Sequence, residues 1–556
     1  MKRFVVIILL YLTALPVICF GEDIYETRLN SGLRNTEAYS YLLMEKAREN
    51  TAESVQLLKE AVKMSPDLPP VYFALAKERF SPSSTGVFES VEYVIEGISA
   101  YTRNFWYEFT LAGSLFFGLV ISFVVAIAII FATRFPGDIR LFTHDLAESK
   151  NLMLLLVLLI VISGMSPLLF IAGMLILFGM YMKKLDRIVV YLFLLFLVSS
   201  PLLFRTSAMF LHTLSSSSLK AIAEVNESKD NTYAFTALKN NDDYPSLFSY
   251  ALALKREGHY DEAVAVYQRL LQKRSDPEVY VNLGNCYFAL KKMDEATAAY
   301  LKALEIKPLA SAYYNLSQVS RDRLDFEKGN EYFRQALAVN RDSVAEYRSI
   351  YSRNPNRFVV DETLPPSEFW GLALLNTGNV SAFGASVLPP FFLSGAALLL
   401  VMLNFLLNTL IRERAYRCKR CNTILCPRCE RRLTWGSMCQ ACYASIVKLD
   451  EMQLKDRVAK LLSIYGHQKR RKDIMKILSF IMPGVPQIYA GKILSGFLFL
   501  WPFLFFLVLP LTNQIFVGGG IFFSHNFFTW CAIFIAAFIY VISNIITRQR
   551  IAKGWL

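Results

Sequence analysis

Residues 280–308 read YVNLGNCYFALKKMDEATAAYLKALEIKP, and the same pattern is written once before and once after them. Small residues recur 33 positions apart at Ala263, Ala296 and Gly329. Two further columns keep this spacing: Tyr267, Tyr300 and Phe333, and Leu271, Leu304 and Leu337. Repeats of this length form stacked supersecondary units. The stretch 246–342 therefore predicts a helical solenoid of three units.

The middle unit carries the clearest pattern, at Tyr280, Leu283, Gly284, Tyr287, Ala296, Tyr300, Ala303 and Pro308. These positions resemble the tetratricopeptide repeat, an antiparallel helix pair in which small residues allow close crossing and an aromatic side chain fills the gap. The ankyrin repeat has a similar period, but its Thr-Pro-Leu-His signature is absent. The resemblance implies repeats at about 246–277, 277–309 and 310–342 within a capped domain, 212–352, that binds proteins.

Such a solenoid binds its partner in a groove lined by the first helix of each repeat. The predicted groove residues are Tyr280, Asn282, Asn285, Tyr313, Asn315 and Gln318. A side-chain amide can hold the backbone of a bound peptide, which makes the three asparagines candidates for that role. The alternative is that these residues are solvated polar positions.

The composition predicts a membrane protein, because 54% of the 556 residues are hydrophobic and the mean hydropathy is positive. We expect a signal peptide at 1–21 and an exported, repeat-like helical module at 22–104. Membrane segments follow at 105–211, comprising a span to Thr133, a central hairpin in 152–182 or a single tilted span there, and a span at 188–211. Further spans are expected at 386–411 and in a C-terminal hairpin, 476–547.

The basic residues predict the orientation of these spans. Residues 412–475 hold sixteen Lys and Arg against six Asp and Glu, so most of the net charge of +13 lies beside the membrane. Positive loops mark the cytoplasmic side. This placement predicts a bacterial inner-membrane protein whose repeats are exported and whose C-terminus is cytoplasmic, and it disfavours nucleic acid as the partner.

Six of the nine cysteines form three Cys-x2-Cys pairs: Cys418 and Cys421, Cys426 and Cys429, and Cys439 and Cys442. Two such pairs supply the four thiolates of a tetrahedral structural Zn²⁺ site. The first and third pairs, or the second and third, can form it. The predicted cytoplasmic placement favours metal over disulfides, so we expect a zinc module at 412–447, followed by a basic helix at 448–475.

A Gly- and Pro-rich bend, PGVPQIYAGK at 483–492, precedes the last two predicted spans. It resembles the Pro-Gly-x-Gly-Gln-x-Tyr-x-Gly signature of the two-transmembrane-helix domain family, with Pro486 where a glycine is usual. The small residues are expected to let helices approach closely. The family's role is poorly defined, so this resemblance adds little about function.

The sequence shows no nucleophile with a paired base, no phosphate-binding loop and no carboxylate pair, and its five histidines are scattered. The predicted span interiors hold essentially no ionisable residue, which disfavours a transporter. We therefore expect an all-α membrane scaffold without enzymatic activity that binds a protein or peptide. The alternatives are a signalling protein that couples outside binding to the zinc module, and a component of a transport complex.

Overall fold

The computed structural model describes residues 24–146, 166–349, 354–376, 389–410, 414–426, 438–447, 453–517 and 526–554. The predicted signal peptide and much of the predicted hairpin at 152–182 lie outside these ranges. The described residues are mostly helical, as expected for an all-α protein, and the chain divides into two compact units. Unit 1 comprises Met1–Phe109 and Thr213–Asn376, and unit 2 comprises Thr110–His212 and Thr377–Leu556.

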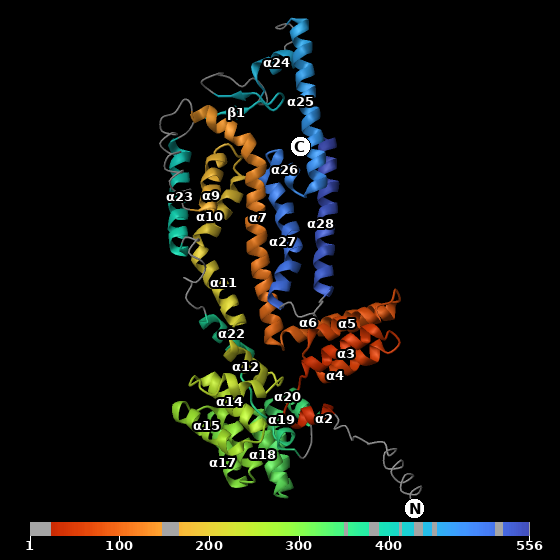
Figure 1. Cartoon of the computed structure of the whole chain (residues 1–556), viewed down its shortest axis with the longest axis vertical. Coiled ribbons are helices and arrows are strands. Elements are labelled where there is room, and N and C mark those ends of the chain that lie inside the picture. Colours follow the sequence, from red (N-terminus) through yellow and green to blue (C-terminus); the bar gives the residue numbers. More distant parts are fainter. Residues whose placement is uncertain are drawn as a thin grey trace, which may run out of the picture. The chain divides into compact units, whose positions relative to one another are not determined.

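Three helix pairs build the solenoid of unit 1, one pair in each predicted repeat (Figure 1). They are α14 (Tyr244–Arg256) with α15 (Tyr260–Lys273), α16 (Pro277–Ala289) with α17 (Met293–Ile306), and α18 (Ala310–Asp322) with α19 (Phe326–Val339). Helices α12 (Ser217–Asn226) and α13 (Thr232–Ala237) precede the stack, and α20 (Arg341–Ser349) follows it. Helices therefore flank the stack at both of its ends.

The repeat pattern has a local cause at each turn and crossing. Two positions beyond the end of the first helix of every pair lies a residue with positive φ, namely Gly258, Lys291 and Leu324, which are 33 positions apart. This left-handed residue closes the helix and turns the chain back. At the middle crossing, a Cβ on Gly284 would lie 2.5 Å from Cε1 of the fully buried Tyr300. Glycine is therefore required there by the aromatic ring it faces.

The predicted N-terminal module holds five described helices: α2 (Ile24–Asn30), α3 (Glu37–Glu49), α4 (Ser54–Met64), α5 (Pro69–Arg79) and α6 (Ser84–Tyr101). Leu43, Leu58 and Leu75 share one buried cluster. Within unit 1 this module is bound to the start of the solenoid, because the Asn35 side chain donates to the Glu227 carbonyl at 3.1 Å. The two modules therefore contact each other.

Unit 2 contains the apolar helices. Three described helices are long and apolar enough to cross a membrane: α7 (Phe105–Leu146), which begins in unit 1, α27 (Ile493–Val517) and α28 (Asn526–Ala552). Two further helices form a bent pair, α10 (Arg187–Val198) and α11 (Ser200–Leu214). If this pair counts as one span, the described residues hold up to four candidate spans. Helices α9 (Pro167–Gly179) and α23 (Pro390–Leu410) are apolar but shorter. Within the unit, α27 and α28 run side by side (Figure 1).

Two helices depart from the predicted spans. Helix α7 continues past Thr133 because Arg134 and Asp138 form an ion pair one turn apart, at 2.6 Å, which satisfies both charges within the helix. The predicted span at 188–211 bends by 59° at Ser199. The ring of Pro201 lacks an N–H donor, which interrupts the helical hydrogen bonds there.

The Gly- and Pro-rich bend joins α25 (Leu454–Ile481), which begins and ends six residues later than the predicted basic helix, to α26 (Val485–Tyr489) and α27. Gly484 has φ +82°, and a Cβ on it would lie 2.2 Å from the carbonyl oxygen of Gly496. The buried Gln487 side chain donates to Thr547 Oγ1 on α28 at 2.7 Å. The motif thus brings two backbones into contact and links the bend to the last helix.

Candidate peptide-binding groove and metal centre

Three of the predicted groove residues, Asn282, Asn285 and Asn315, hold a segment of the same chain. This segment, residues 359–364, follows the short helix α21 (Pro355–Phe358) and has no helical structure. Asn282 binds both backbone groups of Glu362: its Nδ2 donates to the carbonyl at 2.9 Å, and its Oδ1 accepts from the N–H at 2.8 Å. A side-chain amide that makes both bonds pairs with the segment as the backbone of a neighbouring β-strand would. Asn282 is fully buried and is therefore not a solvated position.

The same arrangement recurs one repeat further along the solenoid. Asn315, 33 positions after Asn282, donates to the Val360 carbonyl at 2.9 Å and accepts from its N–H at 2.8 Å. At the other end, the Leu364 N–H donates to Asn226 Oδ1 at 2.8 Å. The bound residues alternate, as the backbone groups on one side of an extended chain do. The solenoid thus presents a ladder of amides that matches an extended peptide.

The second predicted asparagine of the middle repeat, Asn285, is oriented by its neighbours. The Tyr300 hydroxyl donates to Asn285 Oδ1 at 2.8 Å, and Asn315 Nδ2 donates to the same oxygen at 2.9 Å. The Asn285 amide nitrogen therefore points at the segment, where it donates to the Val360 carbonyl at 2.9 Å and to Asp361 Oδ1 at 2.8 Å. The aromatic that fills the helix crossing also sets the direction of a groove amide.

Asp361 anchors the segment electrostatically. Its carboxylate lies 2.8 Å from Lys255 Nζ and 3.4 Å from Arg256 Nε, and the Lys255 side chain is fully buried. Burial alone would raise the pKa of Asp361, but Lys255 and Arg256 outweigh that effect and hold its pKa below the ordinary value. The carboxylate is therefore charged at neutral pH, and it compensates two cations that have little access to bulk water.

Glu362 has the opposite electrostatic environment. Its carboxylate accepts a hydrogen bond from the Ser311 hydroxyl. Burial raises the pKa of Glu362; the Ser311 hydrogen bond lowers it, the negative charge of Glu278 raises it, and the net pKa lies above the ordinary value. Two adjacent carboxylates in the segment thus have pKa values displaced in opposite directions.

The other predicted groove residues lie in or beside the cores of their repeats. Gln318 is buried, Tyr280 packs beside the core of the middle repeat, and Tyr313 packs beside Tyr314. Sequence reasoning missed the groove residues Asn226, Lys255, Arg256 and Ser311. Lys255 does carry a signal, because it is a cation where the next repeat has Phe288.

Four cysteines converge in unit 2. Cys418 and Cys421 lie on and beside the hairpin of β1 (Tyr416–Arg417) and β2 (Ile424–Leu425), and Cys439 and Cys442 lie at the start of α24 (Gln440–Ile446). Their sulfur atoms all lie within 4.8 Å of one another. A tetrahedral zinc site with bonds of about 2.3 Å requires sulfur separations of about 3.8 Å, and Cys421 Sγ lies 3.7 Å from Cys439 Sγ. The four residues fit a zinc site with four cysteine ligands.

Of the middle cysteine pair, Cys426 is not part of this group. Cys426 is buried beside Leu141 and Ala415, and Cys429 lies outside the described residues. The pKa of the Cys421 thiol is lowered, whereas those of Cys439 and Cys442 are raised. Burial raises the pKa of Cys421, but hydrogen bonds from Thr423 and from the other cysteines lower it to about 6. Of the two cysteine sets left open by the spacing, the structure brings together the first and third pairs.

Comparison with known proteins assigns the solenoid. Residues 246–276 and 277–308 each match a model of the tetratricopeptide repeat. The chain is also 38% identical over 66 residues to the mitochondrial import receptor subunit TOM70 of Saccharomyces cerevisiae, in two strains, which covers 11% of this chain and 11% of that protein. Residues 246–308 are therefore tetratricopeptide repeats, which indicates a role in protein–protein interaction. The chain spans about a tenth of the length of this curated relative.

Proposed function

We propose that this protein is a membrane-anchored, non-enzymatic scaffold whose solenoid binds an extended acidic segment of a protein partner. The observation that carries the proposal is the amide ladder, in which Asn315, Asn282 and Asn226 bind the backbones of alternate residues 360, 362 and 364. Backbone hydrogen bonds of this kind provide affinity for any extended chain, whereas selectivity must come from the side chains.

The buried cations provide that selectivity. Removing one partner of a buried ion pair costs about 3–5 kcal/mol, because the other charge is left uncompensated. A ligand that lacks a carboxylate at the position of Asp361 would leave Lys255 and Arg256 in that state. The groove therefore selects ligands with an acidic residue flanked by residues such as Val359, which is 1% exposed, and Leu364, which is 7% exposed.

A partner has to replace the chain's own segment. The segment is covalently attached at both ends, to helix α21 and to α22 (Pro366–Leu375), so its effective concentration at the groove is high. A partner therefore competes only if it binds more tightly per residue, or if something weakens the hold on the segment. Occupation of the groove by residues 359–364 therefore sets the minimum affinity that a partner needs in order to bind.

One observation favours the signalling alternative as a second candidate function. Along the chain, the bound segment leads directly into α22 and then to the apolar helix α23. Displacement of the segment would release the chain that enters α23, and such a release is a means of reporting occupancy to the next part of the molecule. The predicted bacterial inner-membrane location, with the repeats exported and the zinc module cytoplasmic, is part of this proposal and rests on the distribution of Lys and Arg.

The proposal is tested with a labelled peptide of residues 357–366, RFVVDETLPP, added to the full chain in detergent. A D361A chain has a weakened segment and an uncompensated Lys255. We expect this chain to bind the peptide, whereas the unaltered chain binds it much more weakly. A peptide with Asn in place of Asp361 should lose at least about a hundredfold in affinity for the D361A chain.

An N282A/N315A/D361A chain is the matched control, because it keeps both cations but loses two steps of the amide ladder. It should bind neither peptide, while circular dichroism reports retained helical structure. Equal binding of the Asp and Asn peptides would refute the selectivity. Absence of binding to a folded D361A chain would refute the proposed peptide-binding function.

A further inference from the structure

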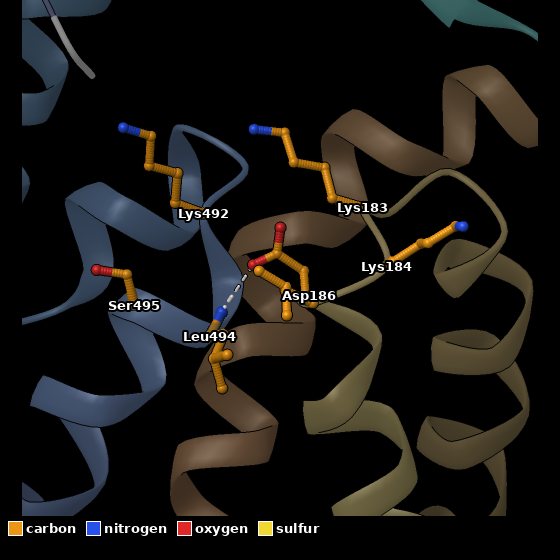
Figure 2. Close-up of a pocket in the computed structure, with 7 residues that line it drawn as sticks. Lys183, Lys184, Asp186, Lys492, Leu494 and Ser495 are labelled. Atoms are coloured by element: carbon orange, nitrogen blue, oxygen red, sulfur yellow. Dashed lines mark hydrogen bonds between the residues drawn. The ribbon is translucent and has the colours of Figure 1, made fainter.

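A cavity of about 450 Å³ opens in unit 2 between two loops that are distant in the sequence. One loop connects α9 to α10 and contributes Lys183, Lys184 and Asp186, and the other connects α26 to α27 and contributes Lys492. Figure 2 shows Lys183 and Lys492 extending to the same side of the cavity, while Lys184 points away from them. The cavity thus lies between two helix connections, and two ammonium groups extend to one side of it.

The charged residues of the lining give it a net positive charge. Three lysines line the cavity, and Asp186 is the only acid among the lining residues that the structure describes. One oxygen of Asp186 accepts a hydrogen bond from the Leu494 N–H at 2.9 Å (Figure 2). This hydrogen bond caps the N-terminus of α27. Asp186 therefore links the two loops and also reduces the local positive charge.

More cations lie next to the lining. Arg550 donates to Oγ of the lining residue Ser495 at 3.2 Å, and Arg471 donates to the Ala490 carbonyl at 3.4 Å. Burial lowers the pKa of Lys492, and the positive charges of Arg550, Lys183 and Arg471 lower it further, against the opposing effect of Asp186. The cations at this end of the unit repel one another, and an anion between them would relieve that repulsion.

The cavity lies where the apolar helices end. Helix α9 ends at Gly179, α10 begins at Arg187 and α27 begins at Ile493, so both loops lie just beyond apolar segments. In a membrane this is the level of the lipid headgroups, and basic pockets between helices at that level bind anionic headgroups. A volume of about 450 Å³ falls in the range of small-molecule sites and exceeds what one inorganic phosphate requires.

We propose that the cavity lined by Lys183 and Lys492 binds the phosphate of an anionic phospholipid headgroup. Lysine binds phosphate as a compact point charge with three donors. The two ammonium groups extend to one side of the cavity and would both attract a phosphate bound there, and the lipid's acyl chains can extend along the apolar helices. A soluble phosphate compound shares the headgroup's chemistry, and the test separates the two sources.

Native mass spectrometry of the full chain in detergent, titrated with phosphatidylglycerol, tests the site. We expect the unaltered chain to retain phosphatidylglycerol in preference to phosphatidylcholine, and K183Q/K492Q to retain it at least about fivefold more weakly. K183R/K492R, which keeps both charges, should retain it. K455Q/K460Q removes the same charge from α25, away from the cavity, and should match the unaltered chain.

The outcomes distinguish the sources. Competition by inorganic phosphate that displaces the lipid completely at equal concentration would identify a soluble phosphate site and overturn the lipid assignment. Equal loss of lipid in K183Q/K492Q and K455Q/K460Q would show a general effect of charge and overturn the site. Lipid retention that depends on Lys183 and Lys492 and persists in inorganic phosphate supports the proposal.

Discussion

Replacing Asp361 by Asn is expected to release residues 359–364 from the groove without unfolding the solenoid. The substitution keeps the shape of the side chain and an acceptor for Asn285, but it removes the charge that compensates Lys255 and Arg256. Breaking a buried pair in this way costs about 3–5 kcal/mol. Because every 1.4 kcal/mol is a factor of ten, the opening equilibrium of the segment should rise by about two to three and a half powers of ten.

Hydrogen exchange measures this opening directly. The N–H groups of Val360, Glu362 and Leu364 donate to groove asparagines and are therefore protected while the segment is bound. In the D361N chain, protection of a peptide that covers these residues should fall by the predicted factor, whereas protection of α16 and α17 stays unchanged. The matched control T363A lies in the same segment and removes no charge.

Two results would contradict the reasoning. Unchanged protection in D361N would mean that the ion pair does not hold the segment. A uniform fall across α14 to α19 would mean that the segment is an inseparable part of the solenoid, and then it is no model for a displaceable ligand. Adding K255M to D361N removes the uncompensated ammonium and should restore part of the protection, with a coupling of about 1–3 kcal/mol.

Three other perturbations have defined outcomes. Because the pKa of Glu362 is raised, its contribution to holding the segment is complete below about pH 4.5 and is lost as the pH rises through the raised pKa. In E362Q, the segment's protection from hydrogen exchange at neutral pH should therefore increase, and its dependence on pH through this group should disappear. C418S should abolish bound zinc in elemental analysis of the purified chain, whereas C426S should retain it. G496A places a Cβ 2.5 Å from the Gly484 carbonyl oxygen, so it should lower the free energy of unfolding by about 1–3 kcal/mol and with it the melting temperature. The control G395A, whose added Cβ meets no atom within 4 Å, should leave the melting temperature unchanged.

The sequence by itself determined the repeats, because each unit must bury the same small and aromatic residues at the same crossing. The columns at Ala263, Ala296 and Gly329, and at Tyr267 and Tyr300, were therefore readable without any structure. It also predicted three asparagines as ligands of a peptide backbone, but not Asn226, which lies before the repeats. It showed the cysteine pairs, because metal ligands require fixed local spacing.

Only the tertiary structure decided what these residues meet. Val360 lies 45 positions beyond Asn315, and no local pattern links the two, so the place of the segment in the groove depends on how the chain folds back. The same holds for the selection of the first and third cysteine pairs, and for the meeting of Lys183 with Lys492. Local spacing encodes which chemistry is available, whereas packing between distant segments determines the burial, the partners and the charge that each group experiences.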